Sequence, residues 1–225
     1  MKCLRVVSAV LIALAVAAVL ALMVVAGFSL PGAQQASAQG TVNFDIDPEI
    51  TGNTADTLGA VEDCLRVDGS GGFDGTPDVT IDVVVWGDTL APRAYDASVV
   101  YEPAKVDPVS WDGLIKLPGA LDLTRKHSWT PRLIGGAGHL MGGLGIPGDG
   151  TILRIDLDVD FTIPTVATLR LDPDPPWLAY SSVAGDHPTT TDGRGALAIN
   201  TDCDTDSDGD ELPDALDNCP GTPNP

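Results

Sequence analysis

The chain has 225 residues, of which 12 are basic and 32 acidic, so its formal net charge at pH 7 is −20. A charge of this sign and size repels nucleic acids and anionic membrane surfaces and attracts cations, which excludes DNA and RNA binding. The length allows one sizeable β domain with its own core and one small appendage.

The N-terminus has the pattern of a secretory signal peptide. Lys2 and Arg5 precede an almost wholly apolar run over residues 6–30, and small residues at 36–38 (ASA) form a cleavage pattern. We therefore predict a signal peptide over residues 1–38 and a protein that is secreted, extracellular or held at the cell surface. A retained membrane anchor is the alternative, because the apolar run approaches the roughly 20 residues that span a bilayer.

Residues 39–201 are predicted to form an antiparallel two-sheet β-sandwich. Apolar and polar side chains alternate with a period of two, and the chain has 25 glycines and 18 prolines but few helix signals. Each alternating segment is expected to turn its apolar side to the core and a row of charge to solvent. Strands are predicted over residues 41–47, 62–67, 79–87, 94–103, 151–163, 165–172 and 195–200.

Two segments of this domain lack the alternation. Between residues 110 and 150 the pattern weakens, and the glycine-rich stretch GGAGHLMGGLGIPGDG is predicted to be a loop. The sequence DPDPPW at 172–177 has three prolines, which exclude a central strand and favour a rigid turn between two late strands.

Three cysteines remain after removal of the predicted signal peptide, namely Cys64, Cys203 and Cys219. An odd number in a secreted chain leaves one thiol unpaired or intermolecular. One disulfide is expected, either Cys64 to Cys203 or Cys203 to Cys219, and the sequence does not choose between these two pairings.

The last segment, 202–225, has the spacing of a calcium-binding loop. Its acids recur at positions 1, 3, 5, 9 and 12 of a twelve-residue loop, and a backbone carbonyl stands at position 7, which is the ligand pattern that wraps one Ca²⁺. Hard oxygen ligands without an imidazole or thiolate pair argue against zinc. The predicted ligands are Asp206, Asp208, Asp210, Leu212 through its carbonyl, Asp214 and Asp217.

This segment resembles a thrombospondin type 3 repeat, because the same spacing ends in Asn218-Cys219-Pro220. The resemblance implies that the five aspartates and the Leu212 carbonyl hold Ca²⁺. Two features depart from the family pattern. Glu211 stands at position 6, where the sharp turn favours glycine, and only one repeat is present where the family stacks several.

The larger domain resembles a cohesin. The likeness rests on DVTIDVVVWG at 78–87, on the following segment with Tyr101-Glu102-Pro103 in place of Tyr-Asp-Pro, and on GDGTILRIDLDV at 148–159. It implies a jelly-roll sandwich without enzymatic activity that binds a protein partner called a dockerin, or carbohydrate, at the bacterial cell surface.

Two other functions are weighed against this one. The four tryptophans Trp86, Trp111, Trp129 and Trp177 could stack on sugars in a carbohydrate-binding module, although tryptophans in such a domain more often anchor the core. A secreted hydrolase could use paired aspartates of the alternating strands or a serine with one of His127, His139 and His187, but no catalytic motif accompanies them.

The sequence therefore predicts a secreted, calcium-binding, non-enzymatic module in adhesion or surface assembly, with a protein or glycan partner and no membrane span after signal cleavage. Its predicted domains are 1–38, 39–201 and 202–225.

Overall fold

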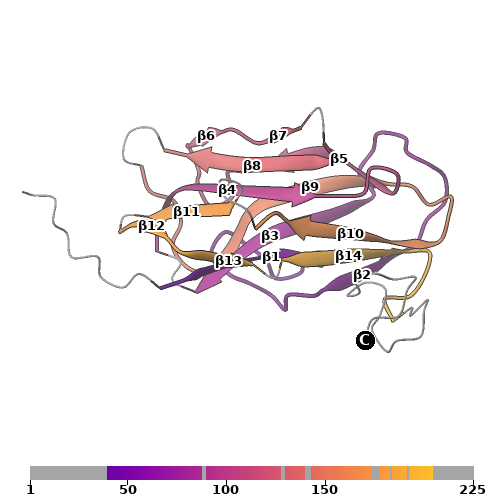
Figure 1. Cartoon of the computed structure of the whole chain (residues 1–225), viewed down its shortest axis with the longest axis horizontal. Coiled ribbons are helices and arrows are strands. Elements are labelled where there is room, and N and C mark those ends of the chain that lie inside the picture. The colour runs from indigo at the N-terminus through magenta and orange to yellow at the C-terminus, as the bar shows by residue number, and fades with distance from the viewer. Residues whose placement is uncertain are drawn as a thin grey trace, which may run out of the picture. The chain divides into compact units, whose positions relative to one another are not determined.

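The computed structural model describes residues 40–87, 90–127, 130–139, 143–173, 178–182, 184–191 and 193–204. Within these residues the regular structure is entirely β (Figure 1). No helix in the described part is long and apolar enough to cross a membrane. The strands are β1 (Val42–Asp47), β2 (Cys64–Val67), β3 (Val79–Gly87), β4 (Pro92–Val100), β5 (Val106–Asp112), β6 (Leu121–Asp122), β7 (Arg125–Lys126), β8 (Arg132–Gly138), β9 (Gly150–Val159), β10 (Thr165–Leu171), β11 (Leu178–Ser182), β12 (Gly185–His187), β13 (Thr189–Thr191) and β14 (Arg194–Ile199).

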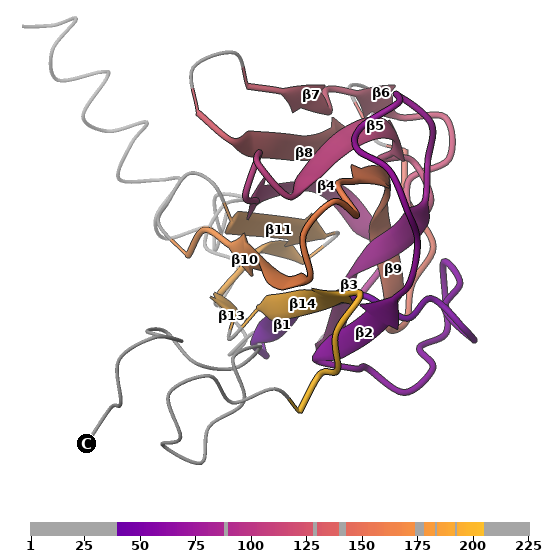
Figure 2. The same cartoon turned by 90° about the vertical axis from the view of Figure 1, so that its right-hand side faces the viewer.

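The strands form two sheets that pack face to face, and Figure 2 shows them from the side. The five-stranded sheet has the order β13-β1-β3-β9-β5. The nine-stranded sheet has the order β12-β11-β4-β10-β14-β2, and β8 joins the other edge of β4 and carries β6 and β7. Pairing is antiparallel except between β1 and β13 and between β14 and β2. The predicted two-sheet β-sandwich is confirmed.

The core lies between the sheets and includes aromatic rings from both. Phe44 of β1 and Tyr180 of β11 meet edge to face, with ring centroids 6.4 Å apart. The hydroxyl of Tyr180 donates to the carbonyl of Leu90, and that of Tyr95 donates to the carbonyl of Gly113, each at 2.7 Å. Both tyrosines therefore bury their rings without leaving a hydroxyl unpaired. Other fully buried side chains are Ile46, Ile81, Leu133, Leu153, Ile155, Leu157 and Leu169.

Every segment predicted as a strand contains one, but the structure adds strands that the pattern did not predict. The glycine-rich stretch over residues 135–150, predicted to be a loop, begins inside β8, a strand between β4 and the short strands β6 and β7. Gly135 faces the core there, and a Cβ at this position would lie 2.5 Å from the side chain of Leu153 in the opposite sheet. Glycine thus lets the two sheets approach, which is why a strand with poor β propensity is retained.

Strands β10 and β11 follow one another along the same edge of β4. Leu171 of β10 pairs with Val99, and Leu178 of β11 pairs with Ala97, so β10 ends and β11 begins on either side of Ser98. The two strands are separate, and residues 174–177 of the predicted rigid turn between them lie outside the described residues.

The Tyr-Glu-Pro turn fastens β4 to β10. Tyr101 is buried in the core, and the carboxylate of Glu102 accepts hydrogen bonds from the amide and hydroxyl of Thr168, both at 2.8 Å. Lys105 forms an ion pair with the same carboxylate at 2.8 Å. Burial alone would raise the pKa of Glu102, but these hydrogen bonds outweigh it and lower the pKa.

Candidate functional site

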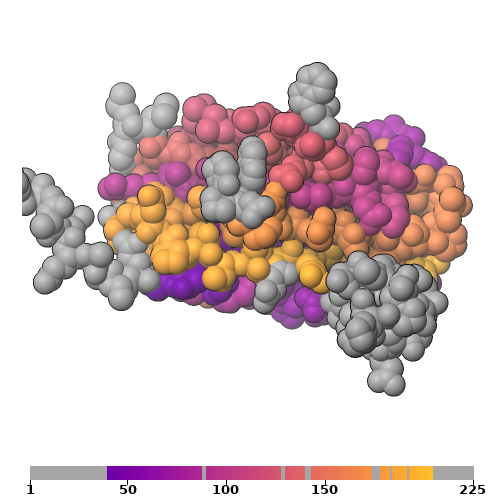
Figure 3. All heavy atoms as spheres, viewed as in Figure 1, coloured from indigo at the N-terminus to yellow at the C-terminus, as the bar shows by residue number. Residues whose placement is uncertain are grey.

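The outer side of the nine-stranded sheet carries a surface of small side chains, which we call the flat face. Asp96 of β4 is aligned with Gly136 of β8 on one side and with Ala179 of β11 on the other, and all three point away from the core. In the next row of the same strands, Ala94 of β4 is aligned with Gly138 of β8 and with Ser181 of β11, so this row contains small residues only. In Figure 3 this side is turned to the viewer, with β8 in pink, β4 in magenta and β11 in orange. The flat face consists of Ala94, Asp96, Gly136, Gly138, Ala179 and Ser181.

Asp96 is the one charged residue of the flat face. Burial against its neighbours raises the pKa of its carboxyl, and the positive charge of Arg125 partly opposes this. A Cβ at Gly136 would lie 2.7 Å from Asp96 Oδ1, so a larger residue there would displace the carboxylate from its present position. The carboxylate is thus held between neighbouring strands while it stays accessible, ready to accept hydrogen bonds from a ligand.

Exposed apolar side chains border the flat face. Leu121 of β6, which pairs with Gly138, is 48% exposed, and Leu123 is 51% exposed. On the opposite border a shallow hollow of about 400 Å³ lies over β4, β11 and β12, lined by Asp96, Ala179 and Asp186 among others. A nearly level centre with leucines at one border is a shape that suits docking of another protein.

The outer side of the five-stranded sheet is different, because a loop over residues 48–63 covers part of it. The alternating aspartates of β1, β3 and β9 were expected to face solvent, and for three of them this is wrong. Asp47 and Asp82 are fully buried and Asp158 is 2% exposed. Asp47 accepts a hydrogen bond from Asn53 Nδ2 of the covering loop at 2.8 Å, and burial raises the pKa of its carboxyl.

One ion pair beneath the covering loop joins two strands of this sheet. Arg154 of β9 donates from Nε and Nη2 to the two carboxylate oxygens of Asp82 on β3, each at 2.7 Å. Thr151 Oγ1 donates to the same carboxylate at 2.9 Å, and Arg154 Nη2 also reaches the carbonyl of Asn53 at 3.5 Å. Asp47 and the Asp82–Arg154 pair thus hold the loop in place, whereas Asp158 accepts hydrogen bonds from the amides of Asp74 and Gly75. These three buried carboxylates do not supply the accessible pair that the glycosidase interpretation requires.

A second cation beneath the covering loop is Lys116. Its side chain is fully buried, and Nζ donates to the carbonyl of Ala55 at 2.6 Å. Burial lowers the pKa of Lys116 to about 8, although the charges of Asp149 and Asp56 oppose the shift. The lysine therefore links the covering loop to the segment between β5 and β6.

A serine and a histidine are brought together at the hairpin of β11 and β12. Ser182 Oγ lies 2.7 Å from His187 Nε2, and the amide of Ala184 donates to the same hydroxyl at 3.0 Å. Ser182 is 1% exposed, so a substrate carbonyl cannot reach its oxygen. The pair closes the hairpin, and the hydrolase alternative gains nothing from it.

The tryptophans within the described residues do not form a shared platform for sugars. Trp111 pairs with the core residue Ile155 and packs against the core, whereas Trp86 pairs with Asn43 on the outer side of the sheet. Trp129 and Trp177 lie outside the described residues.

The chain leaves the sandwich at a covalent junction. Asn200, at a positive φ of 50°, directs the chain away from β14, and its side chain bonds both backbone groups of Gly69 at 2.9 and 3.1 Å. Cys203 then forms a disulfide with Cys64 of β2, with 6.0 Å between the Cα atoms. Asp202 forms an ion pair with Arg66 beside it. Of the two pairings that the sequence left open, the structure contains Cys64 to Cys203.

The predicted calcium ligands from Asp206 to Asp217 lie outside the described residues. Among the residues that the structure does describe, no cluster of three or more histidine, cysteine, aspartate or glutamate side chains could hold a metal ion. Calcium binding therefore stays a prediction from the sequence.

Comparisons with known proteins relate the sandwich to one fold. No protein-family model and no curated protein matches the chain. The seventh ScaB type I cohesin from Pseudobacteroides cellulosolvens is similar to it, with 14% sequence identity, a TM-score of 0.53, and coverage of 72% of this chain and 94% of that one. A type I cohesin–dockerin complex from Clostridium thermocellum matches with 11% identity, a TM-score of 0.50, and coverage of 71% and 99%. The described domain thus has the cohesin-like jelly-roll fold.

Proposed function

We propose that this chain is a secreted or cell-surface assembly module that binds a protein partner through the flat face and catalyses no reaction. The flat face carries this proposal, because it surrounds one exposed carboxylate with small side chains. Backbone and side chains of a partner can approach such a surface closely, and the carboxylate supplies a fixed hydrogen-bond acceptor.

The fold supports the same function. One of the similar structures is a complex of a type I cohesin with a dockerin. We therefore infer that the partner of this chain is a dockerin-like domain. The C-terminal segment fits the role of a calcium-stiffened connector, since five aspartates spaced for Ca²⁺ follow directly after the disulfide junction.

Binding to dockerins after export tests the proposal. The protein is expressed in an exporting host and purified from the medium, where N-terminal sequencing should find Gln39 first. Biolayer interferometry against a panel of type I dockerins, beginning with one from Clostridium thermocellum, should detect micromolar or tighter binding. Ala179→Arg places a long charged side chain on the flat face, beside Asp96, and should weaken that binding at least tenfold.

Ile163→Arg is the matched control, because Ile163 is 69% exposed and lies between β9 and β10, outside the flat face. It introduces the same charge and should leave dockerin binding unchanged. Equal binding by Ala179→Arg and the wild type would remove the flat face from the proposal. Failure to bind any member of a broad dockerin panel would overturn the dockerin-like partner.

A further inference from the structure

The hollow of about 400 Å³ over β4, β11 and β12 has a carboxylate on each side, and we call it the acidic hollow. Asp96 of β4 is the register partner of Ala179 on β11. Asp186 of β12 is the register partner of Ser181, two residues further along β11. Asp186 points away from the core together with Ser181, because the next residue of β12, His187, is turned inward and buried.

The carboxylates of the acidic hollow have no counter-charge in direct contact. Among the residues that the structure describes, none forms an ion pair or hydrogen bond with the carboxylate of Asp96 or of Asp186, and both side chains are exposed. The positive charge of Arg125 on β7 acts on Asp96 and offsets only part of the effect of burial on its pKa. The hydroxyl of Ser181 also lacks a hydrogen-bond partner within the described part of the chain. The acidic hollow thus presents two carboxylates and a hydroxyl beside small side chains.

The separation of the two carboxylates suits an organic cation. Asp96 and Asp186 lie two strands and two residues apart, which places their Cα atoms about 12 Å from each other. A planar guanidinium, which carries N–H donors along its edges, can bridge the gap that remains between the two side chains. A calcium ion takes about six to eight oxygen ligands, and no described residue adds a third acid to these two. An organic cation is therefore favoured over a metal ion.

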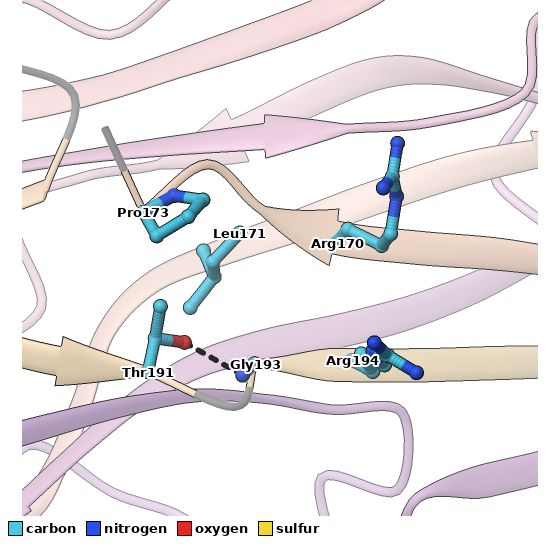
Figure 4. A pocket seen from close by; sticks show the side chains of 6 residues that line it. All are labelled: Arg170, Leu171, Pro173, Thr191, Gly193 and Arg194. Atoms are coloured by element: carbon cyan, nitrogen blue, oxygen red, sulfur yellow. Dashed lines mark hydrogen bonds between the residues drawn. The ribbon is translucent and has the colours of Figure 1, made fainter. Parts of the chain in front are cut away.

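The other hollow described on this sheet does not gather its polar groups in the same way. It has a volume of about 420 Å³ and is lined by Arg170 of β10 and Arg194 of β14, among others. Figure 4 shows the side chain of Arg170 directed away from Arg194 and from Thr191, so these groups do not converge on one ligand. The polar groups of the acidic hollow, by contrast, border a single depression.

We propose that the acidic hollow, made of Asp96, Ser181 and Asp186, binds one arginine side chain of the protein partner that docks on the flat face. Hydrogen bonds between guanidinium and carboxylate are charge-assisted and directional, so two carboxylates select arginine over a neutral side chain. The net charge of −20 also attracts a basic partner. The inference rests on the proposed function, because the acidic hollow shares Asp96 and Ala179 with the flat face, but the hollow itself can be tested without the partner.

Nuclear magnetic resonance of the exported, purified protein provides that test. Backbone amide signals are followed during titration with the blocked dipeptides acetyl-Arg-Arg-amide, acetyl-Lys-Lys-amide and acetyl-Gln-Gln-amide. We expect saturable shifts at Ser181 and Asp186 with the arginine peptide, and a dissociation constant in the millimolar range. The lysine peptide should bind at least threefold more weakly, because an ammonium cannot bridge both carboxylates, and the glutamine peptide should not saturate.

Variants separate this site from the general attraction of an acidic protein for positive charge. Asp96→Asn and Asp186→Asn should each weaken binding of the arginine peptide at least fivefold, because each removes one of the two charged acceptors. Asp63→Asn is the matched control, since it removes an exposed aspartate next to β2, at the other edge of the same sheet, and should leave the affinity unchanged. All three variants replace an exposed carboxylate with an amide of the same size, so all should fold, which circular dichroism checks.

Equal weakening by all three variants, or shifts that do not saturate, would overturn the site. Equal affinities for the arginine and lysine peptides would overturn the choice of arginine. Dockerin binding that is as tight in Asp186→Asn as in the wild type would show that the partner does not use the acidic hollow. Failure of every dockerin to bind, with the arginine peptide still held at Ser181 and Asp186, would instead contradict the proposed function and leave the cation site in place.

Discussion

The carboxylate of Asp82 is wholly buried, yet it takes two hydrogen bonds from the guanidinium of Arg154, which is about one-third exposed. The pair lies under the covering loop of residues 48–63 and joins β3 to β9. Because one partner is desolvated and the other reaches solvent, the two sides of the pair should respond differently to substitution.

Asp82→Asn should destabilise the protein by about 2–4 kcal/mol, because the wholly buried carboxylate accepts hydrogen bonds from Arg154 and Thr151 that an amide cannot all accept. Urea unfolding followed by tryptophan fluorescence measures the loss. Asp68→Asn removes an aspartate that pairs with Arg66 in an exposed position, and the midpoint should stay where it is. Similar losses in the two variants would contradict a special role for the buried pair.

Lys116 should make stability depend on pH above neutrality. Its folded pKa of about 8 lies below the ordinary value of 10.5, so between these values the unfolded chain binds more protons than the folded one. Stability must then rise with pH across this window, by about 2 kcal/mol between pH 7 and 9.5. Urea midpoints at several pH values measure the slope.

Lys116→Met is the comparison for this pH dependence, because it keeps the length of the side chain and removes the charge. Its stability should be nearly flat over the same range. The range ends below pH 10 because burial raises the pKa of Tyr95, so ionisation of the unfolded tyrosine would lower stability beyond it. A wild-type slope that survives in Lys116→Met would assign the effect to another group.

The disulfide between Cys64 and Cys203 should contribute about 2–5 kcal/mol, since it closes a loop with a sequence separation of 139 residues. Replacing both cysteines with alanine should lower the urea midpoint and abolish its sensitivity to reductant. Cys219→Ala serves as the control and should change neither quantity. A loss in Cys219→Ala as large as in the double variant would favour the other pairing that the sequence allowed.

Calcium binding is tested by isothermal titration of the exported protein. One Ca²⁺ should bind, and Asp206→Ala or Asp210→Ala should weaken binding at least tenfold, because each removes a predicted carboxylate ligand. Glu211→Gly should tighten it several-fold, since a non-glycine residue at positive φ costs about 1–2 kcal/mol.

Asp204→Asn is the matched control for the calcium ligands, because Asp204 is exposed and precedes the predicted loop. It removes the same charge and should alter calcium affinity only slightly. No heat above background with the wild type would refute the calcium prediction. If Asp204→Asn and Asp210→Ala weakened calcium binding equally, the effect would come from the net charge and not from specific ligands.

The alternation of side chains predicted most of the sandwich, because a period of two depends only on which side of a strand is buried. The prediction for residues 79–87 coincides with β3, and the one for 165–172 differs from β10 by one residue. β8 was missed because three glycines remove the apolar signal. Their role depends on contacts with Leu153 and Asp96 on other strands, which no local pattern contains.

The flat face was equally hidden in the sequence. Asp96 looks like any polar residue of an alternating strand, and its importance comes from the alignment of β4 with β8 and β11. For aspartates of β1, β3 and β9 the prediction was wrong in another way, because side chains expected to face solvent are buried. Their spacing resembles a solvated sheet surface, but residues 48–63 fold back over Asp47 and Asp82, and a return of this kind has no periodic signature.

The junction at Cys203 also has a mechanical consequence. A pull on the chain beyond residue 204 passes through the sulfur atoms to Cys64 at the edge strand β2, and the residues between the two cysteines cannot be drawn out while the covalent bond holds. Tension from a bound partner or from a surface attachment would therefore enter the sheet through β2 and β14 together, and would not peel β14 away from its end. The sandwich and its flat face would keep their shape under load.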